Sequence, residues 1–104
     1  MTAFKKVAQL SEVPPGEKII VDYAGEDVGI VNLAGELYAI SDVCTHDDGP
    51  LMEGEMDGDC VICPRHGARF NVKTGDYTMP AFAPVPRYHV KLDGDDILIA
   101  PMDE

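Results

Sequence analysis

Two short boxes of metal-binding residues constrain this chain more than any other feature. Cys44-Thr45-His46 and Cys63-Pro64-Arg65-His66 each offer one thiolate and one imidazole, and residues 47–62 lie between them. Each box is tight enough to fit within one loop. A single metal centre using all four ligands therefore requires a fold that brings two loops together, with two sulfur and two nitrogen ligands between them.

This ligand set matches one kind of centre in particular. A [2Fe–2S] cluster needs four protein ligands, and a cluster with two thiolates on one iron and two imidazoles on the other is a known type. We expect each loop to give its cysteine to the buried iron and its histidine to the outer iron. The ligands to one [2Fe–2S] cluster are therefore predicted to be Cys44, His46, Cys63 and His66.

Two other interpretations of the boxes remain open at this point. The residues could be unrelated core cysteines and surface histidines, although two such boxes flanked by glycine and proline argue against coincidence. A structural zinc site also accepts two cysteines and two histidines. Zinc modules more often pair Cys-x₂₋₄-Cys with His-x₃₋₅-His, so the Cys-x-His spacing disfavours zinc.

The remaining cysteine and histidine have simpler interpretations. Cys60 lies three residues before Cys63 in a segment that is typical of a strand, where residues i and i+3 point to opposite faces. We therefore predict that Cys60 is a buried apolar residue and not a ligand. His89 has no partner box and is predicted to be an ordinary sheet residue in the strand 87–92.

The rest of the chain predicts an all-β fold. With 104 residues the chain is long enough for one small domain, residues 1–104, and its short apolar runs between turns indicate an antiparallel β-sandwich or small barrel. The expected strands are residues 4–8, 18–23, 28–33, 36–40, two short runs around 57–58, 69–72, 87–92 and 96–100. Residues 79–86 contain three prolines, which predicts a loop or an edge segment.

Charge and hydrophobicity exclude several classes of protein. The formal net charge is −11, from 19 acidic residues against 8 Lys and Arg, so a nucleic-acid binder is not expected. No signal peptide and no apolar run of ~20 residues is present, which predicts a soluble, cytoplasmic protein without a membrane anchor. Six acidic residues and no basic residue lie between the boxes, so the segment from Asp47 to Asp59 is a candidate docking surface for a basic partner.

With these features the chain resembles the Rieske family, in particular the small soluble Rieske ferredoxins of bacterial oxygenase systems. The resemblance covers Cys44-Thr45-His46, Cys63-Pro64-Arg65-His66-Gly67, Phe70, Thr74-Gly75 and the closing segment 90–98. It implies the Rieske iron–sulfur fold, with a cluster-binding subdomain of two loops at about 43–50 and 62–70. It also implies a proline-bearing loop over the cluster, for which residues 80–86 are the candidate, and histidine ligands at an exposed tip.

Departures from the high-potential members of the family are also informative. Those proteins resemble this chain but carry an extra cysteine in each box, joined as a disulfide, where this sequence has Gly49 and Arg65. They also place serine and tyrosine hydroxyls near the cluster, at positions that here read Ala68 and Phe70. Fewer hydrogen-bond donors stabilise the reduced state less, so we expect a potential near the lower end of the Rieske range, roughly −150 mV.

The resemblance implies an electron-transfer protein rather than an enzyme. The expected role is a monomeric one-electron carrier that accepts an electron from an NAD(P)H-dependent flavoprotein reductase and delivers it to a terminal oxygenase. The main alternative is a small Rieske subunit of an assimilatory nitrite reductase-like complex; a subunit of an arsenite oxidase is disfavoured by the lack of an export signal. A complete Rieske oxygenase is excluded by length.

Overall fold

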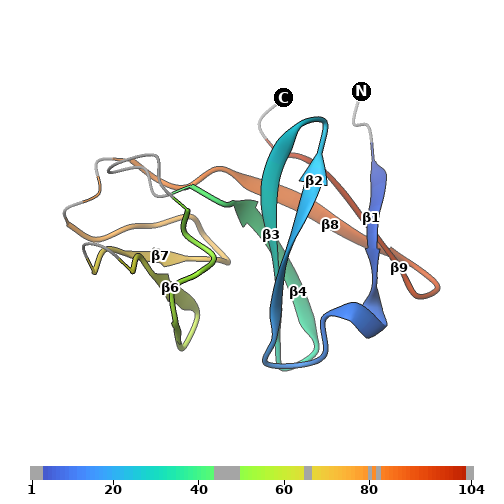
Figure 1. The fold of residues 1–104 in the computed structure, drawn as a ribbon, viewed down its shortest axis with the longest axis horizontal. Coiled ribbons are helices and arrows are strands. Elements are labelled where there is room, and N and C mark those ends of the chain that lie inside the picture. Colours follow the sequence, from blue (N-terminus) through green and yellow to red (C-terminus); the bar gives the residue numbers. More distant parts are fainter. Residues whose placement is uncertain (1–3, 44–49, 65–66, 80, 82, 103–104) are drawn as a thin grey trace.

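Antiparallel β-structure dominates the chain (Figure 1). The computed structural model describes residues 4–43, 50–64, 67–79, 81 and 83–102. Their elements are β1 (Lys5–Gln9), the short 3-10 helix η1 (Leu10–Glu12), β2 (Lys18–Tyr23), β3 (Glu26–Leu33), β4 (Glu36–Ser41), β5 (Met56–Asp57), β6 (Cys60–Ile62), β7 (Arg69–Asn71), β8 (Arg87–Asp93) and β9 (Asp96–Pro101). The expected all-β fold is confirmed.

The larger sheet has six strands in the order β1-β9-β8-β4-β3-β2. Its two end strands, β1 and β2, also contact each other, so the sheet curls towards a barrel. Alternate side chains of a strand point to the same face, and one face of this sheet is turned inward. Val28 and Ile30 of β3 and Ile97 and Ile99 of β9 are fully buried in the resulting core.

Strand β3 begins at Glu26, two residues earlier than the predicted start at Val28. The connection from β2 needs only Ala24 and Gly25, which both have positive φ (53° and 87°), and Tyr23 pairs directly with Glu26. Two consecutive residues with positive φ form the tight hairpin turn whose twist matches that of the strands. Glycine adopts this conformation freely, whereas alanine does so at a cost.

A smaller sheet, β5-β6-β7, forms a second lobe beside the first (Figure 1). The two lobes share a second apolar cluster, which is distinct from the core of the large sheet. Val31 and Ile40 from the large sheet pack in the same buried cluster as Val61, Cys63 and Phe70 from the small lobe. Hydrophobic packing therefore holds the small lobe in a fixed position against the large sheet.

The proline-bearing segment connects the small lobe back to β8. None of its described residues (79, 81 and 83–86) lies in a strand, as predicted. Ala81 and Val85 are nevertheless buried, and the Val85 N–H donates to the Gly75 carbonyl at 3.2 Å. Thus the segment is irregular but anchored. In the part of the chain that the structure describes, no helix is long and apolar enough to cross a membrane.

Candidate functional site

The second box begins where β6 ends, and hydrogen bonds join its first residue, Cys63, to Gly67 and Ala68, which follow the box. The Cys63 N–H donates to the Ala68 carbonyl at 2.7 Å, and the Cys63 carbonyl accepts from the Gly67 N–H at 3.0 Å. Gly67 has φ of +77°, a left-handed conformation that glycine adopts without strain. The backbone around Cys63 is thus fixed on both sides of the box.

The surroundings of Cys63 are apolar. Its exposed fraction is 1%, and it belongs to the same buried cluster as Leu51, Met52, Ala68 and Phe70. A free thiolate would be costly in such a place, whereas a thiolate that shares its charge with a bound metal ion is not. The environment of Cys63 therefore fits a ligand to the inner iron of a cluster.

The side chain of Asp42 holds the two ends of the first loop together. Its Oδ1 accepts from the Leu51 N–H at 2.8 Å and from the Met52 N–H at 2.6 Å. The Asp42 N–H in turn donates to the carbonyl of Asp27 in β3 at 3.0 Å. The sequence reasoning missed Asp42, although an aspartate two residues before Cys44 is a residue type that often organises nearby backbone N–H groups.

Only Cys63 among the four predicted ligands is described by the structure. Cys44, His46 and His66 lie outside the described residues, as do Asp47, Asp48, Gly49 and Arg65. The structure does bring the neighbourhoods of the two boxes together, because Leu51, just after the first box, shares a buried cluster with Cys63. Within the described ranges, no group of three or more His, Cys, Asp or Glu is placed to hold a metal ion.

Cys60 and His89 both lie in strands, as predicted, but the predicted burial of Cys60 is wrong. Cys60 lies in β6 and pairs with Asn71, but it is half-exposed and not buried as expected. Partial burial raises the pKa of its thiol, and the nearby charge of Asp59 raises it further. His89 is an exposed residue of β8, paired with Ala100.

The positions compared with high-potential Rieske proteins have the expected character. Ala68 and Phe70 are both completely buried, close in sequence and in space to Cys63. Neither side chain carries a hydrogen-bond donor. These two positions therefore supply no hydroxyl group to the site, which is the basis of the predicted low potential.

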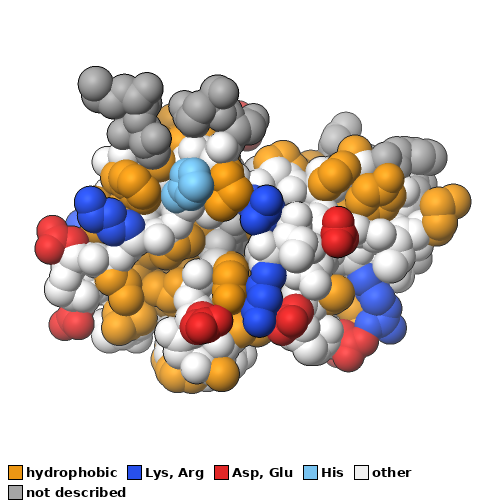
Figure 2. Space-filling model, turned by 180° about the vertical axis from the view of Figure 1, so that it is seen from behind, with side chains coloured by type: hydrophobic (Ala, Val, Ile, Leu, Met, Phe, Trp, Pro, Cys, Tyr) orange, Lys and Arg blue, Asp and Glu red, His pale blue; other side chains and the backbone are white. Residues whose placement is uncertain are grey.

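Part of the acidic segment between the boxes is neutralised by bases that follow the second box. Asp57 forms an ion pair with Arg69, and the Asp59 carboxylate lies 3.6 Å from the Lys73 ammonium. On the face in Figure 2, basic side chains of the small lobe lie beside acidic ones. Glu53 and Glu55 are exposed, and neither forms an ion pair with another described residue. Fewer acidic residues are therefore candidates for docking a partner than the sequence suggested.

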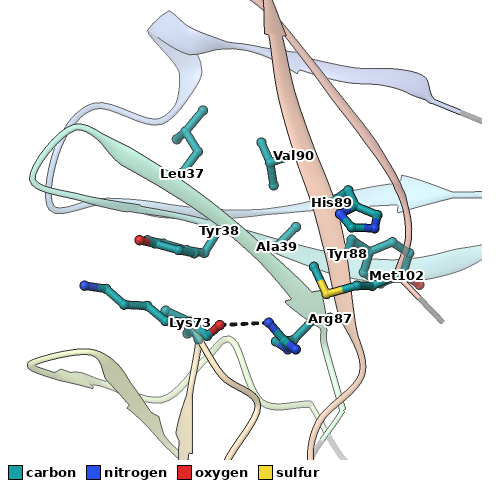
Figure 3. Close-up of a pocket in the computed structure, with 10 residues that line it drawn as sticks. Leu37, Tyr38, Ala39, Lys73, Arg87, Tyr88, His89, Val90 and Met102 are labelled. Carbon is teal, nitrogen blue, oxygen red and sulfur yellow. Dashed lines mark hydrogen bonds between the residues drawn. The ribbon is translucent and has the colours of Figure 1, made fainter. Parts of the chain in front are cut away.

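The turn after β7 is joined to the large sheet beside a cavity of about 160 Å³ (Figure 3). Arg87 of β8 donates from Nη1 to the Lys73 carbonyl at 2.9 Å. The Lys73 ammonium lies 5.7 Å from the centre of the Tyr38 ring in β4, close enough for a cation–π contact. These contacts add polar links to the shared core and help to orient the small lobe.

Comparison with known proteins identifies the family. Residues 3–89 match the model of the Rieske [2Fe-2S] domain. The chain is 37% identical over 98 residues to the ferredoxin component of biphenyl 2,3-dioxygenase from Rhodococcus jostii, covering 93% of this chain and 92% of that protein.

Solved structures agree with this assignment. The ferredoxin of carbazole 1,9a-dioxygenase from Nocardioides aromaticivorans matches with a TM-score of 0.87 and 37% identity, over 94% of this chain and 97% of that one. A ferredoxin solved as a complex with the oxygenase of carbazole 1,9a-dioxygenase matches with a TM-score of 0.86 and 32% identity, over 93% and 92% of the two chains.

These relatives are electron-transfer components and not catalysts, which confirms the predicted class of protein. The family match also favours a [2Fe–2S] cluster with mixed cysteine and histidine ligands over the zinc site considered above. The chain therefore belongs to the Rieske [2Fe-2S] domain family, as a ferredoxin-type electron carrier with one Rieske-type cluster.

Proposed function

We propose that this ferredoxin is a monomeric, cytoplasmic carrier that takes one electron from an NAD(P)H-dependent flavoprotein reductase and delivers it to a terminal oxygenase. The relatives described above support the oxygenase as partner, since one of them was solved in a complex with its oxygenase. The observation from this chain that carries the proposal is Cys63, buried in a closed turn beside the pinned end of the first loop.

In this proposal the cluster is held by the loops at about 43–50 and 62–70, within a single domain of residues 1–104. Cys44 and Cys63 would bind the inner iron, and His46 and His66 would bind the outer iron. When bound, the cluster supplies a one-electron redox couple. The chain's own residues would position it: Asp42 holds the two ends of the first loop together, and the buried apolar side chains around Cys63 exclude water.

Spectroscopy tests the ligand assignment. The dithionite-reduced protein is expected to give a rhombic paramagnetic resonance signal with an average g near ~1.9, lower than for all-cysteine ligation. Cys63→Ser should abolish it. The matched variant Cys60→Ser should leave it intact, because Cys60 precedes Val61 in β6 and so points to the opposite face from Val61, which packs in the same buried cluster as Cys63. Loss of the signal in Cys60→Ser, or its survival in Cys63→Ser, would contradict the assignment.

Reconstitution tests the proposed role. With NADH, a flavoprotein reductase and a terminal oxygenase of the biphenyl type, electron delivery to the oxygenase is expected to depend on this ferredoxin. A ferredoxin that contains its cluster but is not reduced by any NAD(P)H-dependent flavoprotein reductase would refute the role.

A small subunit of a nitrite reductase-like complex remains the second candidate. The relatives reported above are ferredoxin components at 37% identity, which favours the shuttle. Size-exclusion chromatography with light scattering separates the two roles, because a shuttle is expected to be a stable monomer. Co-purification with a large sirohaem enzyme would support the subunit instead.

A further inference from the structure

A groove of about 430 Å³ lies on the small lobe directly beside the second box. It is lined by Glu53, Gly54, Glu55, Ile62, Cys63, Pro64 and Gly67. The lining thus combines two carboxylates with the backbone and side chains of the box itself. No side chain of opposite charge lines this groove among the described residues.

Gly54 explains why the two glutamates lie so close to the box. A Cβ on Gly54 would be 1.7 Å from the carbonyl oxygen of Ile62, so only glycine allows the backbone to lie against β6 at this point. The Gly54 N–H donates to the Leu51 carbonyl at 3.0 Å, and the Ile62 N–H donates to the Glu55 carbonyl at 2.9 Å. The segment that carries both carboxylates is therefore held rigidly along the groove.

The other described acids of the same segment are already paired. Asp57 and Asp59 use Arg69 and Lys73 as partners within the small lobe. Glu53 and Glu55 form no ion pair with another described residue, on a protein whose net charge of −11 already repels acidic surfaces. A groove that combines an apolar wall with carboxylates is complementary to a long basic side chain, whose stem packs while its charged end is neutralised.

We propose that this groove receives a lysine or arginine side chain from the docking face of a basic redox partner, with Glu53 and Glu55 as its counter-charges. The inference rests on the proposed electron-carrier role and deepens it by naming the contact. Because Cys63 and Pro64 form part of the lining, a partner anchored here would be held next to the cluster-binding turn.

Stopped-flow reduction of cytochrome c, a basic one-electron acceptor, tests the proposal. The reduced holoprotein is compared with Glu53→Gln/Glu55→Gln and with the matched control Glu17→Gln/Glu26→Gln, which removes the same charge from exposed sites near β2 and β3 of the large sheet. The ionic strength runs from about 10 mM to about 150 mM, over which the Debye length falls from ~30 Å to ~8 Å.

We expect the groove variant to reduce cytochrome c roughly 3- to 10-fold more slowly than wild type at low salt, with a flatter salt dependence. The control is expected to change by less than about twofold, because its charges lie outside the contact. A third variant, Asp57→Asn/Asp59→Asn, should resemble the control since these carboxylates are already paired.

Visible spectra and midpoint potentials first establish that each variant keeps its cluster. Equal rates for the groove variant and the control would overturn the inference while leaving the carrier role intact. A wild-type protein that is fully loaded yet transfers no electron to any acceptor would instead overturn the proposed function.

Discussion

Removing the Asp42 carboxylate should destabilise the protein more than any ordinary surface substitution. Asp42→Ala deprives the N–H groups of Leu51 and Met52 of their acceptor, with donor–acceptor distances of 2.8 and 2.6 Å in the native protein. Both residues are almost fully buried, so water replaces the lost acceptor poorly. Hydrogen bonds to a charged group contribute about 1.5–3 kcal/mol each, and the two share one acceptor, so we expect a loss of ~2–4 kcal/mol.

Thermal unfolding of the holoprotein measures this loss. A change of 1 kcal/mol moves the midpoint of a domain of this size by about 4–8 °C, so Asp42→Ala should lower it by at least ~8 °C. Asp42→Asn keeps one acceptor oxygen without the charge and should lie between Asp42→Ala and wild type. The exposed Asp93, in the β8–β9 hairpin, provides the control variant Asp93→Ala.

The rate of cluster loss gives a second readout of the same substitution. If Asp42 holds the ends of the first loop together, Asp42→Ala should bleach faster in air than wild type, whereas Asp93→Ala should not. An Asp42→Ala midpoint within about 2 °C of Asp93→Ala would refute the reasoning, since the smallest expected loss exceeds that shift.

Four further predictions concern single side chains. Ala68→Ser should raise the midpoint potential by roughly 40–90 mV in film voltammetry. The added hydroxyl is expected to bind the reduced cluster ~1–2 kcal/mol more strongly than the oxidised cluster, and this difference corresponds to that shift for a one-electron couple. Gly54→Ala should prevent stable folding or cost over ~2 kcal/mol in urea unfolding, because its Cβ meets the Ile62 carbonyl oxygen. Ala24→Asn should stabilise the protein by about 0.5–1 kcal/mol, since asparagine tolerates positive φ better; no gain would argue against the turn. The pKa of the Cys60 thiol is raised in the folded protein. The resulting contribution to stability is complete below the pKa of the unfolded thiol and is lost as the pH rises through the folded pKa. Urea midpoints of Cys60→Ser should therefore fall less steeply above pH ~8.5 than those of wild type.

The sequence predicted the strand pattern well because turns and apolar alternation are local signals. Strand β2 has the predicted bounds, and the error at β3 came from a turn that needs two residues where four were assigned. The half-exposure of Cys60 was harder to foresee, because burial in a three-stranded sheet depends on which segments cover it.

Long-range pairing marks the limit of what the sequence could predict. The acids at 57 and 59 lie in a stretch without bases, yet β7 and the following turn bring Arg69 and Lys73 to them. Likewise, Asp42 acts on residues 51 and 52 across the first box, a contact that no spacing rule indicates. The ligand boxes can be predicted from the sequence because metal ligands must have particular chemistry, whereas a hydrogen-bonded support can be built in many ways.

The apolar setting of Cys63 also bears on the speed of electron transfer. When a charge moves, surrounding dipoles and waters must rearrange, and this reorganisation energy contributes to the barrier. Around Cys63 the described neighbours are tightly packed aliphatic and aromatic groups on a hydrogen-bonded turn, which have small dipoles and little room to move. A cluster bound there would have a low reorganisation energy on the side that faces these residues. Most of its reorganisation energy would then come from solvent on the opposite side.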